Sequence, residues 1–184
     1  AVKRLSDANL DRDKRSFVDY LIAVNHLLDG NEQRALEFLE KSSEQEPYAL
    51  EPGLLTINVL GSSFRKNEQR IIDKITLMEK KYDSDKYSGQ YSLLAPYYRV
   101  ASLYYNNKDY LSAQAYYEKA LGQITLIQKL VGADDLTRLI NLGIANCHYQ
   151  LGYKGKASKL FAKVTSGLEE EKRKQFEAQY AGTR

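Results

Sequence analysis

Apolar residues recur along most of the chain at intervals of three and four positions, which is the spacing of amphipathic helices. The clearest example is segment 97–121, in which two apolar stripes are separated by a polar turn at 106–109. Segments 21–42 and 144–164 have the same arrangement and superpose on the first without gaps. The recurrence predicts an all-α protein built from repeated pairs of antiparallel helices.

Three slots of this superposition indicate how the helices of a pair would pack. The first two slots hold only alanine and the third holds a large residue: Ala23, Ala101 and Ala145, then Ala35, Ala113 and Ala157, then Leu39, Tyr117 and Phe161. Alanine lets two helices approach closely, and the large residue one turn later fills the space toward the next pair. We therefore expect the alanines at helix crossings.

These slots, together with the turn glycines Gly30 and Gly152, resemble the tetratricopeptide repeat, a helix-turn-helix unit of about 34 residues. The resemblance implies a right-handed superhelical solenoid of about four helix pairs, closed by a C-terminal capping helix. The expected parts are a lead-in at 1–15, a repeat domain at 16–184 with units at about 16–47, 53–82, 94–125 and 138–166, and a cap at 168–182.

The pattern is least regular between the first and third units. Ile72 stands where the other units have the second alanine, after an expected turn at 66–67, and a polar linker is expected at 82–90. Beyond Leu121 the apolar spacing continues to Val131, which predicts an extended helix before a turn at 132–135. Stretched repeats of this kind resemble those of kinesin light chains and bacterial regulators.

Composition narrows the classes of function. The net charge is only +3, without a basic stripe, which argues against nucleic acid as a partner. One cysteine, Cys147, excludes a disulfide framework and a zinc site built on several thiolates. No apolar run reaches the roughly 18 residues of a membrane-spanning helix, and no signal segment is recognisable, so we expect a soluble chain that is an excised domain or a processed form.

Motifs for catalysis are absent from the sequence: there is no phosphate-binding loop, nucleophile elbow or metalloprotease helix. His26 and His148 share one repeat slot on an apolar face, where a histidine is usually a packed residue. Cys147 and His148 are adjacent and point about 100 degrees apart on a helix, so they cannot pair as nucleophile and base. We expect no enzyme activity, no metal and no cofactor.

Tyrosine is unusually frequent, with 15 residues, ten of them between positions 82 and 117. In the superposition Tyr98 and Tyr105 point to the concave wall of a first helix, where aromatic side chains anchor peptides well. Ordinary packing between helices is the alternative. The expected binding residues on this wall are Asn58, Phe64, Arg65, Tyr98, Arg99, Tyr105, Asn106, Asn146 and Tyr149.

Asn58 and Arg99 match two slots of the repeats that clamp the C-terminal carboxylate of heat-shock chaperones. Tyr20, Val24 and Ala95 replace the other clamp residues, which argues against that ligand. The function expected instead is a noncatalytic scaffold that binds a protein, a peptide or a partner helix in the concave groove, with Arg99 available to an acidic side chain. The alternative is a ligand- or peptide-sensing domain of a bacterial regulator.

Overall fold

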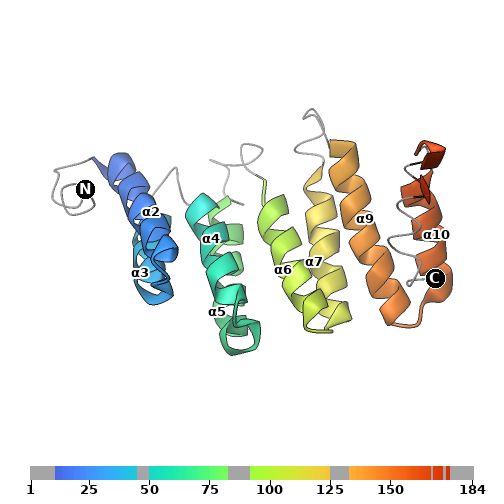
Figure 1. The fold of residues 1–184 in the computed structure, drawn as a ribbon, viewed down its shortest axis with the longest axis horizontal. Helices are drawn as coiled ribbons and strands as arrows, with labels where there is room; N and C mark the ends of the chain where they lie inside the picture. Colours follow the sequence, from blue (N-terminus) through green and yellow to red (C-terminus); the bar gives the residue numbers. More distant parts are fainter. Residues whose placement is uncertain are drawn as a thin grey trace. The chain divides into compact units, whose positions relative to one another are not determined.

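The computed structural model describes residues 11–44, 50–82, 92–124, 133–166, 168–171 and 173–174. The elements of these residues are eight α-helices in sequential pairs, which confirms the all-α prediction (Figure 1). The chain divides into two compact units, 1–88 and 89–184, and each is described by itself.

The described part of unit 1 contains two helix pairs. Its helices are α2 (Arg12–Leu28), α3 (Glu32–Ser43), α4 (Leu50–Gly61) and α5 (Phe64–Tyr82), and each packs on the next along the chain. The Asp11 carboxylate caps α2 by accepting a hydrogen bond of 3.0 Å from the backbone N–H of Lys14. The first helix of the described residues therefore begins inside the segment that was expected to be a lead-in.

The alanine slots of unit 1 lie where the repeat pattern predicts. Ala23 and Ala35 have no exposed surface, and Leu39 joins Ala23 and Val59 in one hydrophobic core. Two hydrogen bonds join α2 and α3 at the end of the first pair that lies away from its turn. Ser16 Oγ donates to Ser42 O at 2.9 Å, and Ser42 Oγ donates to Ser16 O at 2.8 Å. Both serines are fully buried, so this reciprocal pair satisfies polar groups that water does not reach.

The second pair of unit 1 departs from the prediction. Its turn lies at 62–63 rather than at 66–67, so α5 begins at Phe64. Ile71, not Ile72, is the fully buried residue near this point of the helix. The apolar spacing allowed either alignment of the second helix, and the earlier turn selects the one that buries Ile71.

The other four helices lie in the part of unit 2 that the structure describes. These are α6 (Leu94–Asn106), α7 (Tyr110–Gly122), α9 (Ala133–Gln150) and α10 (Lys154–Thr165), with α6 packed on α7, α7 on α9 and α9 on α10. The small slots are again buried, with exposed fractions of at most 2 % at Ala101, Ala113, Ala145 and Ala157. The expectation of close helix crossings is confirmed in both units.

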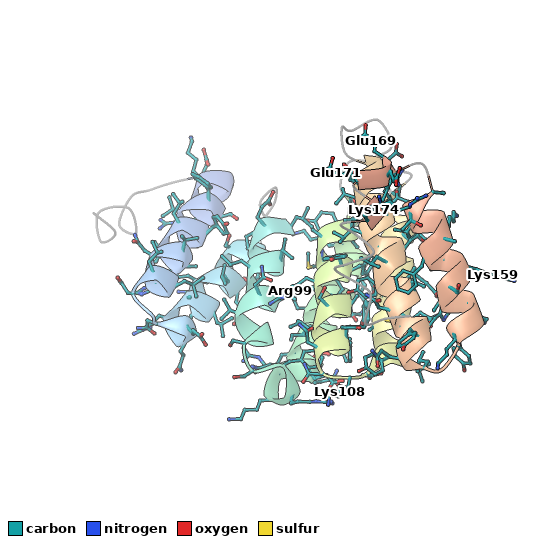
Figure 2. The ribbon with its side chains drawn as sticks, turned by 45° about the vertical axis from the view of Figure 1, so that its right-hand side comes forward. Arg99, Lys108, Lys159, Glu169, Glu171 and Lys174 are labelled. Carbon is teal, nitrogen blue, oxygen red and sulfur yellow. The ribbon has the colours of Figure 1, made fainter. Side chains whose placement is uncertain are left out.

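Three pairs share one turn geometry. The turn residues Gly30, Lys108 and Gly152 have positive φ values of 74°, 65° and 84°. In each turn the next residue donates its N–H to a carbonyl five positions earlier, as in Asn31 to His26 at 2.7 Å and Asp109 to Tyr104 at 3.0 Å. This is the Schellman motif that ends a helix with one left-handed residue. Lys108 adopts that conformation without being glycine, at the turn labelled in Figure 2.

α7 ends at Gly122 with Gln123 as its C-cap, and Ile124 is helical again. The remainder of the extended helix expected up to Val131 lies outside the described residues. The expected turn at 132–135 is corrected: α9 begins at Ala133, and Asp134 and Asp135 occupy its first turn, where acidic side chains favour the helix dipole. Most of the expected linker at 82–90 and of the cap at 168–182 lies outside the described residues. In the described part of the cap, Lys174 pairs with Glu170 at 2.7 Å.

Candidate functional site

The expected binding residues are divided between the two units. Asn58 is half-buried on α4, and Phe64 and Arg65 lie on α5 because the turn comes earlier than predicted. Phe64 is only 4 % exposed and Arg65 is exposed. Phe64 and Arg65 were expected on a first helix, and this placement is wrong because the helix pair reverses before them.

Unit 2 holds the other six residues, on α6 and α9. Tyr98 and Tyr105 are seven positions apart and half-buried on one side of α6. The Tyr98 ring packs edge-on against Tyr117 with centroids 5.5 Å apart, and the Tyr105 ring packs in the same way against Tyr110 at 5.3 Å. Tyr98, Tyr105, Tyr110 and Tyr117 are called the tyrosine cluster below.

Tyr117 is the buried centre of this cluster. Its hydroxyl lies 3.4 Å from Ser102 Oγ, and its ring covers Gly143 so closely that a Cβ there would lie 2.6 Å from Tyr117 Cζ. Burial raises the pKa of Tyr117 to about 12, although the Ser102 hydrogen bond opposes this shift. The large residue of the third slot, Tyr117, therefore extends from α7 to α9, where Gly143 leaves room for its ring.

Tyr105 links α6 to α9 through a hydrogen bond with Gln150, while its pKa is raised chiefly by burial. Gly143, Asn146 and Gln150 are three and four positions apart on α9 and so share one side of that helix. The cluster touches the first and the last of these residues. Asn146 therefore lies between two points at which the cluster meets α9.

Two polar atoms near this surface are buried and make no hydrogen bond within the described residues: Arg99 Nε on α6 and Asn146 Oδ1 on α9. Arg99, which is labelled in Figure 2, follows Tyr98 directly in the sequence and precedes Ser102 by three positions. Asn106 is exposed at the end of α6, and Tyr149 is half-buried near the end of α9. We call the side of unit 2 formed by the tyrosine cluster, Arg99 and Asn146 the α6–α9 face.

Cys147 and the histidines do not form reactive groups here. Cys147 has no exposed surface, and burial raises the pKa of its thiol to about 12, so the thiol is protonated at neutral pH. His148 packs edge-on against Tyr153 at 6.1 Å, and burial lowers its pKa. His26 stacks on Phe38 at 5.6 Å. These contacts are those of packed side chains.

The superposition did not identify Tyr110, Gly143 or Gln150 as part of this surface. Gly143 offered a signal, because glycine inside a helix costs roughly 1 kcal/mol and commonly marks a close approach. The partner of that approach is Tyr117 of the preceding pair. Tyr110 and Gln150 carry no such signal, since both occupy ordinary helical positions.

Within the described residues, no helix is both long and apolar enough to cross a membrane. No group of three or more His, Cys, Asp or Glu side chains in this part of the chain has the proximity needed to hold a metal ion. The chemistry of the α6–α9 face is that of aromatic rings, hydroxyls, an amide and a guanidinium, which binds by contact and hydrogen bonding.

The tetratricopeptide repeat family model matches residues 94–123, which span α6, the Lys108 turn and α7. Comparison of the whole chain with curated proteins and with solved structures found no match. Tetratricopeptide repeats are typically noncatalytic and generally serve protein interaction. The match and the buried alanine slots agree on the same helix pair, and residues 94–123 of this chain are a tetratricopeptide repeat.

Proposed function

We propose that the chain is a protein-interaction module whose α6–α9 face binds an extended peptide segment of a partner protein. The observation that carries the proposal is the partial exposure and the ring packing of Tyr98 and Tyr105. Both are half-exposed, and each is held against a second tyrosine ring. Aromatic side chains that are already fixed lose little conformational entropy on binding, which suits them as anchors.

The polar groups of the face suggest what the peptide offers. Asn146 Oδ1 is a buried acceptor without an intramolecular donor, so it can accept a backbone N–H of an extended peptide once the side chain turns toward the surface. The guanidinium of Arg99 suits a carboxylate, which it can bind through two parallel hydrogen bonds. The expected ligand is thus an extended segment with an acidic residue close to a side chain that packs on the tyrosines.

The test uses peptides selected on the immobilised full chain from a random displayed library. We expect Tyr98→Ala with Arg99→Ala to weaken binding of the selected peptides by about 2 kcal/mol or more, since aromatic and arginine residues dominate such interfaces. Added salt should weaken binding to the wild-type chain more than binding to Arg99→Ala, because the variant has already lost the charged contact. Fluorescence anisotropy with labelled peptides measures both effects.

Tyr153→Ala is the matched control, because Tyr153 is 52 % exposed in the same unit but packs on His148 away from the cluster. It should leave peptide affinity unchanged. Chemical denaturation of each variant separates binding from folding: Tyr98→Ala should cost less stability than Tyr117→Ala. Normal peptide binding by a folded Tyr98→Ala, Arg99→Ala variant would contradict the proposal, as would unfolding of that variant as easily as Tyr117→Ala.

A further inference from the structure

The outer side of α10 carries lysines that the packing of unit 2 does not use. Lys156, Lys159 and Lys163 are exposed and follow one another at intervals of three and four positions, which places them on one side of the helix. Figure 2 shows Lys159 extending outward from α10. Together with Lys154 they are the charged residues of this helix, which contains no acidic residue and no arginine. Lys156, Lys159 and Lys163 are called the lysine row below.

The positive charge of the chain is concentrated on α10. Its four lysines outweigh the net charge of +3 of the whole chain, so the remaining residues together are slightly negative. Within the described residues, no lysine of α10 belongs to an ion pair, whereas Lys174 pairs with Glu170 at 2.7 Å. Lys156 Nζ lies 5.4 Å from the centroid of the Tyr153 ring, a contact that leaves its charge unneutralised. The small net charge therefore conceals one short basic row.

The packed side of α10 is a different one. Ala157 and Val164 are 2 % and 3 % exposed, and Arg138 of α9 donates from Nη1 to Val164 O at 3.0 Å. Successive residues turn by about 100 degrees around a helix. Lys156 and Lys163 each precede a packed residue and therefore lie about 100 degrees from the packed side. The lysine row is thus a surface of α10 that contact with α9 leaves uncovered.

The lysines of α10 do not serve the stability of their own helix. Lys154 and Lys156 lie in its first turn, where the helix dipole disfavours positive charge and where α10 has no acidic side chain. Like charges three and four positions apart on a helix also repel one another, as in the lysine row. A partner that brings negative charge removes both unfavourable terms.

We propose that the lysine row is a docking surface for an acidic helix of a partner protein, with carboxylates at intervals of three and four positions. The row extends over about 10 Å, because each residue advances a helix by about 1.5 Å. A second helix with glutamate or aspartate at the same intervals complements it along this length. The lysine row shares no residue with the α6–α9 face, so this contact is independent of peptide binding there.

The same features favour an acidic protein over the other anionic partners. The apolar side of α10 packs on α9, so no apolar side chain accompanies the row into a lipid surface. The row contains neither arginine nor an aromatic ring on which a base could stack, and such groups are typical of surfaces that bind single-stranded nucleic acid.

The test uses a fluorescently labelled synthetic helical peptide with glutamates at intervals of three and four positions, added to the full chain. The variant Lys156→Gln, Lys159→Gln, Lys163→Gln should weaken binding about tenfold or more, because three exposed charge pairs are lost together. Fluorescence anisotropy measures the affinity. The variant should unfold thermally at the same or a higher temperature, since it removes like-charge repulsion. Unchanged affinity of the folded variant overturns the proposal.

The matched control is the variant Lys66→Gln, Lys80→Gln, Lys108→Gln, which removes the same charge from three exposed lysines outside α10. It should leave the affinity within about twofold, because surface pairing acts over short distances at physiological salt. An equal loss in this control would overturn the proposal by showing general attraction to a positive chain. Tyr98→Ala with Arg99→Ala should leave binding of the acidic helix unchanged, which separates this surface from the α6–α9 face.

Two further comparisons test the partner chemistry. A peptide of the same composition with its glutamates on all sides of the helix should bind several-fold more weakly, since its carboxylates do not form a row. Phosphatidylserine vesicles and single-stranded RNA should bind more weakly than the acidic helix at the same salt concentration. Equal binding of both peptides, or tighter binding of the vesicles or the RNA, overturns the acidic helix as the partner.

Discussion

The pairs α2–α3 and α6–α7 lie in different units and occupy the same repeat slots, so their side chains can be compared position by position. Their inward positions agree: Ala23 and Ala101 are both fully buried, as are Ala35 and Ala113. Their outward positions do not. The outward slots of α2, Phe17, Leu21, Val24 and Leu28, are filled in α6 by Ala95, Arg99, Ser102 and Asn106.

This difference shows which residue positions helix packing constrains and which it does not. A crossing of two helices tolerates only a small residue, so the alanine slots are the same in both pairs. The outward slots carry no such constraint, and the two helices present different chemistry there: an apolar row on α2, and a guanidinium with hydrogen-bonding groups on α6. One repeat framework therefore supports two surfaces suited to different contacts.

The largest expected effect concerns the third slot, which holds Leu39 in one pair and Tyr117 in the other. Tyr117→Ala should destabilise the chain by about 3 to 5 kcal/mol, as truncation of a buried aromatic does. Gly143→Ala should also be destabilising, because its Cβ would lie 2.6 Å from Tyr117 Cζ. Urea denaturation of the single variants and of the double variant measures both effects and their coupling.

In the Tyr117→Ala background the cost of Gly143→Ala should largely disappear, since the clash has been removed. Leu39→Ala is the control, because it truncates the same slot in unit 1 and should leave the cost of Gly143→Ala unchanged. Equal costs of Gly143→Ala with and without the Tyr117 ring would show that α7 does not contact α9 through this pair.

The inward slots were also the part of the structure that the sequence predicted best. Alanine at a crossing recurs at fixed positions in three units, and glycine recurs in the turn of two of them, with Lys108 in the third. The pair α4–α5 was predicted with the wrong turn, because Ile71 and Ile72 are both apolar and only tertiary packing distinguishes them. Of the candidate site, Tyr98 and Tyr105 lie on one side of α6 as expected and Phe64 was assigned to the wrong helix, while the binding role of these residues stays a prediction.

The contacts that the sequence did not reveal join residues far apart in the chain. The hydrogen bonds between Ser16 and Ser42, and that of 3.0 Å from Arg138 Nη1 to Val164 O, close the open ends of two pairs at equivalent slots. Their side chains share no chemistry, so a search for recurring residue types cannot find them. Leu94 and Ala120 hold these slots in the remaining pair, where no polar contact is needed.

A second, smaller effect is expected at the serine pair. Ser16→Ala or Ser42→Ala alone should cost about 1 to 3 kcal/mol, because each leaves a buried polar group without its partner. In the double variant both positions are apolar, as the equivalent Leu94 and Ala120 are in α6–α7. Its loss of stability should therefore be about 1 kcal/mol smaller than the sum of the losses in the two single variants. Urea denaturation would measure this coupling, and strictly additive costs would mean that the two hydroxyls act independently.

The smallest effect is expected at the turns, where the left-handed residue is Gly30 in one pair and Lys108 in the other. Gly30 and Lys108 both have positive φ, and a side chain in this conformation costs roughly 1 to 2 kcal/mol. Glycine loses about 0.5 to 1 kcal/mol more backbone entropy on folding, which offsets part of that cost. Lys108→Gly should therefore stabilise the chain by about 0.5 to 1 kcal/mol, measured as an increase in the urea midpoint.

Gly30→Ala provides the reverse experiment. A Cβ at Gly30 meets no atom within 4 Å, so any loss of stability reports the backbone conformation alone rather than a clash. The loss should be about 1 kcal/mol, opposite in sign to the effect of Lys108→Gly. If both substitutions left the urea midpoint unchanged, the left-handed residue would not limit the stability of these turns, and the two pairs would differ only in their outward slots.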